Sequence, residues 1–229
     1  MKKYKIAAMV ATVIFTFLLP ENIFGGGIKI GYNLNDVSGS EAEWEGYTKK
    51  QTPGFTLNLF TTNALSENLA LQPEIALTLG KGVKYEDDEG HIDISYLMAY
   101  VESSILFKYM LLPDGTFSPS LYAGPVIGYQ IQPDVWFDNH DNDTELDYKI
   151  VNGNPLELGL SVGFETRLKA FVLDFRYFMG FTSFLKEHDP EADYDPEDEV
   201  QIEFYGENNN PMEPDIKNNV IMLMLGYDF

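Results

Sequence analysis

Hydrophobic and polar residues alternate with a period of two along several stretches of the chain. From Leu69 to Leu79 every odd position is apolar or proline, while the even positions carry small or polar residues. Residues 171–181 and 221–229 repeat this alternation. A period of two predicts β-strands, because successive side chains of a strand point to opposite faces. Related stretches occupy residues 27–34, 53–62, 94–109, 119–131 and 155–168. The pattern therefore predicts an all-β fold of eight strands.

The lengths of these strands and of their connections indicate a membrane barrel. A tilted membrane-spanning strand needs about 9–11 residues, whereas soluble strands average about 5–6. Short connections are expected at residues 63–67, 111–118 and 169–170, and long polar ones at residues 35–52, 80–93, 132–154 and 184–216. Alternating short and long connections are typical of outer-membrane barrels, whose short turns face the periplasm. We predict an eight-stranded antiparallel up-and-down transmembrane β-barrel with both chain termini on the periplasmic side.

The start of the chain has the pattern of an export signal. Lys2, Lys3 and Lys5 precede an apolar run over residues 6–20, and small residues suited to cleavage follow near Gly25. A single membrane anchor is the alternative, but the run is shorter than the ~20 residues of a spanning helix. We expect a signal peptide at residues 1–25 and a barrel domain at residues 26–229, which places the protein in the outer membrane.

Charge and composition exclude several classes of protein. The formal net charge is −21 and the chain contains no cysteine. Nucleic-acid binding needs clustered basic residues, so it is not expected. Without cysteine the chain can form no disulfide, no catalytic thiolate and no cysteine metal site.

The two faces of the predicted strands differ in a way that assigns them to lipid and lumen. One row carries large apolar residues such as Phe171, Phe175, Tyr177 and Phe181, and the other mixes small residues with charges of both signs. An eight-stranded interior is only just wide enough for its side chains, which favours aromatics outside. A soluble ligand-carrying barrel with inverted faces is the alternative. Buried charges need partners, so we predict an ion-paired network filling the lumen, formed by Lys29, Glu74, Glu102, Lys108, Glu157, Glu165, Arg167, Asp174, Arg176 and Asp228.

The last residues and several internal stretches resemble known barrel sequences. The ending with Tyr227 and Phe229 resembles the C-terminal signal that barrel-assembly machinery recognises. The chain also resembles the outer-membrane family labelled porin-family or PorT-like. The similar stretches are Asn68-Leu-Ala-Leu-Gln-Pro-Glu74, Leu121-Tyr-Ala-Gly-Pro125, Leu173-Asp-Phe-Arg-Tyr177, Asn218-Asn-Val220 and Gly27-Ile-Lys-Ile-Gly-Tyr-Asn33. The resemblance implies a barrel fold and no particular enzymatic reaction. The chain departs from the family around Ser103–Ser104, where a proline is usual, and in its long acidic loops.

The loops carry the remaining candidate chemistry. Residues 134–147 and 187–215 are rich in carboxylates, the ligands that hard cations prefer. The stretch Asp138–Asp143 lacks the glycine and the bidentate glutamate of an EF-hand, so we expect charged loops screened by cations or met by an extracellular partner. His91, His140 and His188 lie in loops and in no catalytic motif. We expect no enzyme, no cofactor and no specific metal site.

Aromatic residues near the strand ends are candidates for the membrane interfaces. Trp44 and Trp136 lie in predicted loops, and the strands contain Tyr100, Tyr109, Tyr122, Tyr129 and Tyr177. Some of them should form aromatic girdles, with surface recognition as the alternative for the tryptophans. The function we expect is structural or partner-binding. The alternatives are a narrow channel or a component of a transport or secretion machine.

Overall fold

The fold is known from a computed structural model. It describes residues 24–40, 42–43, 46–89, 91–113, 116–139, 144–150, 153–186, 199–200 and 214–229. Nearly all of the expected signal peptide, Trp44, His140, His188 and most of the acidic segment 187–215 lie outside these residues. The strands are β1 (Phe24–Ser38), β2 (Tyr47–Ala64), β3 (Leu69–Asp87), β4 (Ile92–Met110), β5 (Phe117–Asn139), β6 (Thr144–Ile150), β7 (Leu156–Leu168), β8 (Phe171–Gly180), β9 (Glu199–Val200) and β10 (Lys217–Asp228).

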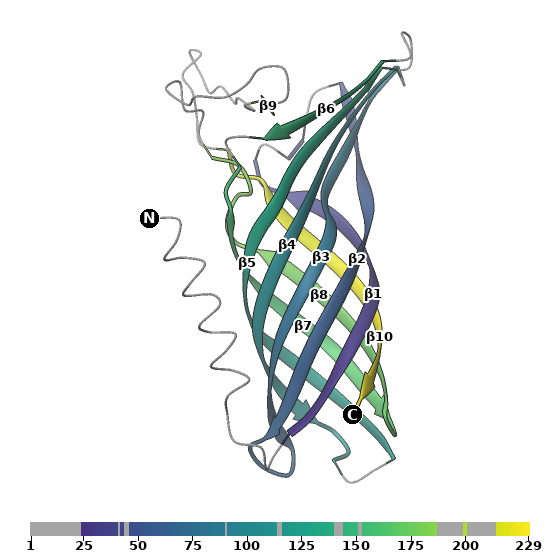
Figure 1. Cartoon of the computed structure of the whole chain (residues 1–229), viewed down its shortest axis with the longest axis vertical. Helices are drawn as coiled ribbons and strands as arrows, with labels where there is room; N and C mark the ends of the chain where they lie inside the picture. Colours follow the sequence, from purple (N-terminus) through teal and green to yellow (C-terminus); the bar gives the residue numbers. More distant parts are fainter. Residues whose placement is uncertain are drawn as a thin grey trace.

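Eight of these strands close into one antiparallel barrel. Each pairs with its neighbour in the order β1, β2, β3, β4, β5, β7, β8, β10, and β10 pairs back onto β1. Short turns join the strands at the end where the C-terminus lies, and the longer connections gather at the opposite end (Figure 1). The predicted eight-stranded antiparallel barrel is confirmed. No helix of the described residues is long and apolar enough to cross a membrane.

The barrel wall turns its large apolar side chains outward. Along β8 the residues alternate strictly, so that Phe171 and Phe175 are exposed while Asp174 and Arg176 are buried. β10 repeats the pattern, with Leu223 exposed and Met224 buried. A continuous band of exposed aromatic and aliphatic side chains is stable only against hydrocarbon, since water would penalise that much apolar surface. The outer face therefore contacts lipid.

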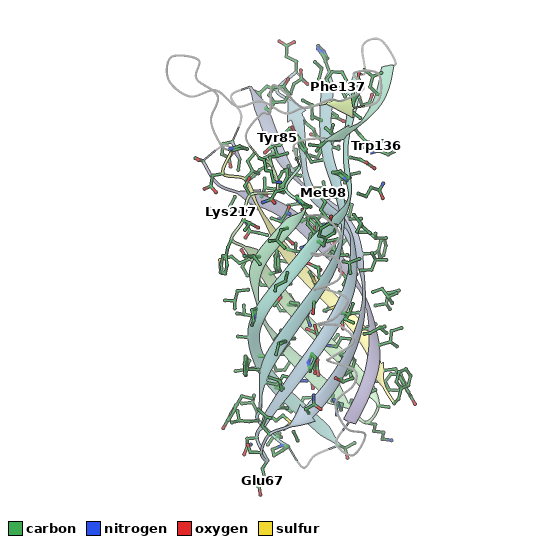
Figure 2. All side chains as sticks on the ribbon, turned by 60° about the vertical axis from the view of Figure 1, so that its left-hand side comes forward. Glu67, Tyr85, Met98, Trp136, Phe137 and Lys217 are labelled. Carbon is green, nitrogen blue, oxygen red and sulfur yellow. The ribbon has the colours of Figure 1, made fainter. Side chains whose placement is uncertain are left out.

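Strands β3, β4 and β5 continue past the barrel at the end away from the short turns, and β6 joins them in a sheet that we call the extension. We define it by residues 81–87 of β3, 92–98 of β4, 132–139 of β5 and all of β6, with β2 alongside. The prediction of loops over residues 80–93 and 132–154 is therefore wrong for most of their length. Figure 2 shows Glu67 at the short-turn end, Met98 near the base of the extension, and Tyr85 and Phe137 beyond it.

The extension is ordered because it has an apolar core of its own. Val83 and Tyr85 of β3 pack with Tyr96 and Met98 of β4, and Val135 of β5 joins them. Three further apolar residues, Phe184, Leu185 and Ile216, cover this cluster from the segments between β8 and β10. The outer face of the extension carries many charged residues, which made the alternation of apolar and polar residues in these strands hard to recognise from the sequence.

A local irregularity separates the extension from the barrel wall. The register of β3 against β4 shifts between Leu79 and Lys81, and Gly80 and Gly82 have φ angles of 79° and 137°. Such angles favour glycine because a Cβ atom would clash with the backbone. A β-bulge increases local twist and re-aims the following side chain. Here it turns Lys81 into the barrel interior.

The strand tyrosines divide between the two faces. Tyr109 and Tyr177 are exposed on the outer wall, and Tyr129 is half-buried. Tyr100 and Tyr122 instead lie inside the barrel, where they are 0% and 4% exposed. Only the outward tyrosines are available for an aromatic girdle. Trp136 projects from the outer face of the extension and is 49% exposed.

Candidate functional site: the charged lumen

Six charged side chains meet in the half of the barrel nearer the short turns. We call this set the lower cluster. Its members come from β1, β3, β4, β7 and β8 and are Lys29, Glu74, Lys108, Glu165, Asp174 and Arg176. All six are at most 4% exposed. Three are cations and three are anions, so the described charges of the lower cluster balance.

Lys29 lies at the centre of the lower cluster. Its Nζ is 3.1 Å from Glu74 Oε1, 2.7 Å from Glu165 Oε2 and 2.7 Å from Asp174 Oδ2. Arg176 donates from Nη1 to Glu74 Oε2 at 2.7 Å and from Nη2 to Asp174 Oδ2 at 2.9 Å. Lys108 also binds Glu165. Each cation bridges strands far apart in sequence, so the cluster ties opposite walls of the barrel together.

Neutral polar groups complete the hydrogen bonding of the lower cluster. The Tyr122 hydroxyl donates to Asp174 and accepts from Arg176 Nε at 2.9 Å. Gln72 donates to Glu74 at 2.7 Å and accepts from Lys108 at 2.8 Å. Buried ions are tolerated only when such partners surround them. The lower cluster meets that condition.

A second, smaller set lies nearer the extension. This upper cluster consists of Lys81, Glu102 and Glu157. Lys81 Nζ is 2.6 Å from Glu102 and 2.5 Å from Glu157, and it lies 4.0 Å from the centre of the Phe178 ring. Thr78 donates to Glu102, and Asn218 donates to Glu157 at 2.7 Å. The aromatic core of the extension lies directly beyond it.

The structure brings together eight of the ten residues proposed from the sequence. Six form the lower cluster, and Glu102 and Glu157 belong to the upper one. The other two, Arg167 and Asp228, pair with each other at 2.7 Å near the short-turn end, where Arg167 is 32% exposed. That these ten residues serve as a structural network stays a proposal.

Sequence reasoning missed Lys81, and the reason is geometric. In an uninterrupted strand the odd positions from Leu69 onward face lipid, which predicts Lys81 outside the lumen. The bulge at Gly80 reverses this phase. The tripeptide Gly80-Lys81-Gly82 was the available signal, because glycines within a strand pattern often mark a bulge.

Buried charged and aromatic side chains of the described residues occupy the lumen. One cavity of about 10 Å³ lies between the two clusters, which is the room needed by about one water molecule. Above it, the rings of Tyr85, Tyr96 and Tyr100 are buried. In the described part of the chain no group of three or more His, Asp or Glu side chains could hold a metal.

A closed barrel with an apolar exterior and a charged, filled interior defines a transmembrane β-barrel of the outer-membrane class. Residues 22–186 match the family model described as outer membrane protein beta-barrel domain, and the chain belongs to that family. The protein is therefore an outer-membrane protein.

The chain is also similar in fold to several small barrels of known structure. Ail, the attachment invasion locus protein of Yersinia pestis, solved with the heparin analogue sucrose octasulfate, is 16% identical, with 90% of this chain and 99% of that one covered and a TM-score of 0.45. Neisserial surface protein A is 11% identical over 89% and 97%, with a TM-score of 0.45. OprG of Pseudomonas aeruginosa is 13% identical over 90% and 94%, with a TM-score of 0.36. No curated protein matches the chain.

Proposed function

We propose that this protein is a sealed outer-membrane barrel that presents the extension as a binding surface outside the cell, without catalysis. The observation that carries the proposal is the length of its strands. β3 and β4 have 19 residues each and β5 has 23, about twice the 9–11 residues that cross a membrane. The surplus forms a sheet with its own core, and a preformed sheet binds without the entropic cost of ordering a loop.

The outer face of the extension indicates the chemistry of a partner. Glu86 of β3, Asp93 of β4 and Asp138 of β5 lie opposite one another in register, and Trp136 is exposed nearby. Carboxylates in directly opposed positions repel one another. Lys84 lies 2.8 Å from Asp93, and its hydrogen bond to that carboxylate raises the pKa of the lysine. Lys84 and Lys50 also pair with Glu86, at 3.0 Å and 3.6 Å, so this row already has counter-charges. We propose that cations or a cationic partner bind instead at the acidic loops, on the strength of the loop sequences.

Two of the alternatives are less well supported. A narrow channel needs a path through the lumen, and the two charge clusters and the aromatic core occupy it. A soluble periplasmic barrel does not agree with family membership or with the exposed apolar wall.

We further propose that residues 1–25 are a cleaved signal peptide. We also propose that the chain is of the PorT-like kind, because its strand motifs resemble that family.

Site-specific labelling tests which end of the barrel faces the medium. The chain has no cysteine, so a single introduced thiol gives no background. We expect Glu89→Cys, in the exposed β3–β4 turn, to react with a membrane-impermeant maleimide on intact cells. The matched variant Glu67→Cys, in the exposed β2–β3 turn, should react only after the cells are opened. Labelling of Glu67→Cys on intact cells would contradict the proposed orientation.

The terminal phenylalanine gives a separate prediction about assembly. Phe229 is 82% exposed, its ring lies 5.8 Å from that of Tyr227, and its N–H donates to the Gly26 carbonyl at 2.7 Å. Because it contributes little packing, deleting Phe229 should slow insertion by the assembly machinery without lowering final stability. Pulse-chase gels that separate folded from heat-unfolded barrel measure this. Phe117→Ala, another exposed aromatic near the same end, should assemble at the normal rate.

A further inference from the structure

The charges buried inside the barrel do not balance. Nine charged side chains of the described residues are buried, of which four are cations and five are carboxylates. The lower cluster contains three of each sign, so the excess belongs to the upper cluster, where Lys81 faces both Glu102 and Glu157. A charge held away from water without a counter-charge is strongly unfavourable, and a buried carboxyl group avoids this cost by keeping a proton.

The groups around the upper cluster do not supply the missing positive charge in the described part of the chain. Arg176 of β8 lines the small cavity between the clusters, but its guanidinium is paired with two carboxylates of the lower cluster. Tyr100 of β4 also faces the two glutamates, and a phenol adds no positive charge. The neighbours of Glu157 on β5 and β10 are the uncharged Gly128 and Asn218.

The hydrogen bonds of the two glutamates differ in one respect. Lys81 and Thr78 donate to the two oxygens of Glu102, which suits an ionised carboxylate. Glu157 accepts from Lys81 at Oε2 and from the Asn218 amide at Oε1, the latter at 2.7 Å. Asn218 is 1% exposed, and its Oδ1 has no hydrogen-bond partner among the described residues. With this amide turned over, Oδ1 would accept a proton carried by Glu157 and would no longer be a buried acceptor without a partner.

We propose that Glu157 of the folded barrel carries a proton at neutral pH, and that the upper cluster is therefore a pH-sensitive element beneath the extension. Glu102 stays ionised and pairs with Lys81, so that the cluster has no net charge. Loss of the proton in alkaline medium leaves two carboxylates on one buried lysine, next to the aromatic core of the extension. The proton thus stabilises the end of the barrel that carries the extension, and raising the pH weakens that end.

The sign of the pH dependence tests the proposal on the purified full-length barrel. A glutamate of the unfolded chain loses its proton near pH ~4.3, so above that value the folded state binds one proton more than the unfolded state. The stability due to this proton is complete below that pH and falls as the pH rises, by about tenfold in the folding equilibrium constant per pH unit. Glu157→Gln removes this dependence, because glutamine is neutral at every pH. In urea titrations the variant should equal the wild-type protein at about pH 4 and be at least about tenfold more stable at about pH 8.

Infrared spectroscopy observes the proton directly, because the carbonyl band of a protonated carboxyl group is separate from the bands of carboxylates. The folded wild-type barrel should show this band at neutral pH, and Glu157→Gln should lack it. Glu165→Gln is the matched control, since Glu165 is also buried but belongs to the balanced lower cluster. This variant should keep the band and be less stable than the wild-type protein at about pH 8, because it leaves a buried cation without its counter-charge.

Three results would each contradict a protonated Glu157. Absence of the carbonyl band from the wild-type barrel at neutral pH would overturn the proposal, whether or not the variants fold. A Glu157→Gln barrel less stable than the wild-type protein at about pH 8 would mean that Glu157 is ionised and acts through its ion pair with Lys81. A band that persists in Glu157→Gln would place the proton on another group and would also overturn the proposal.

Discussion

Replacement of Lys29 by methionine should strongly destabilise the barrel. Lys29 contacts Glu74, Glu165 and Asp174 and is 0% exposed. Its removal leaves three carboxylates to share Lys108 and Arg176. Breaking a buried ion pair from one side costs about 3–5 kcal/mol. Urea titration in detergent, followed by the gel shift between folded and unfolded barrel, measures the loss.

A second substitution distinguishes charge imbalance from loss of packing. Lys29→Met with Glu165→Gln restores equal numbers of cations and anions, and glutamine can still accept a hydrogen bond from Lys108. We expect the double variant to recover a substantial part of the lost stability. Lys50→Met, on the exposed extension, should change stability by less than about 1 kcal/mol. A double variant no more stable than Lys29→Met would mean that the lower cluster does not act through its charge balance.

Replacing Gly163 by valine should also destabilise the barrel strongly. Gly163 pairs with Tyr122 on one side and with Arg176 on the other. A Cβ atom at this position would lie 2.3 Å from the Tyr122 hydroxyl and 2.5 Å from the Phe175 carbonyl oxygen. Overpacking costs about 1–3 kcal/mol, and displacing Tyr122 removes hydrogen bonds from Asp174 and Arg176 at about 1–3 kcal/mol each.

The adjacent residue provides the control for that substitution. Val162 faces lipid and is 38% exposed, so Val162→Leu should leave the unfolding midpoint unchanged. Thermal unfolding followed by circular dichroism in detergent compares the two variants. A Gly163→Val barrel with wild-type stability would show that the neighbouring strand β7 does not confine the Tyr122 side chain.

The barrel wall was predictable because its pattern is local and repeated. Strict alternation from Phe171 to Gly180 reflects one face in lipid and one in the lumen, and both faces can be recognised within ten residues. Charges of both signs on the inner rows predicted ion pairing in general terms. The particular partners could not be predicted, since Lys29 meets Asp174 across 145 positions of sequence. Such contacts depend on how the barrel closes.

The extension and Lys81 of the upper cluster were missed for a different reason. A β-bulge at Gly80 reverses the facing of every later residue in β3, and an unbroken period of two cannot anticipate this reversal. Beyond it, Lys84, Glu86 and Asp87 make the sequence resemble a polar loop. Their strand conformation depends on the inner-facing Val83 and Tyr85, which pack against Tyr96 and Phe184.

A planar-bilayer recording of the purified, folded protein tests most directly whether the barrel is sealed. Ion pairs fill the lumen, the cavity between the clusters has a volume of about 10 Å³, and the aromatic core of the extension lies above them. We predict no discrete conductance steps at any applied voltage. Reproducible single-channel steps that change in size with Lys81→Met or Lys29→Met would contradict a sealed barrel and establish a conducting path through the lumen.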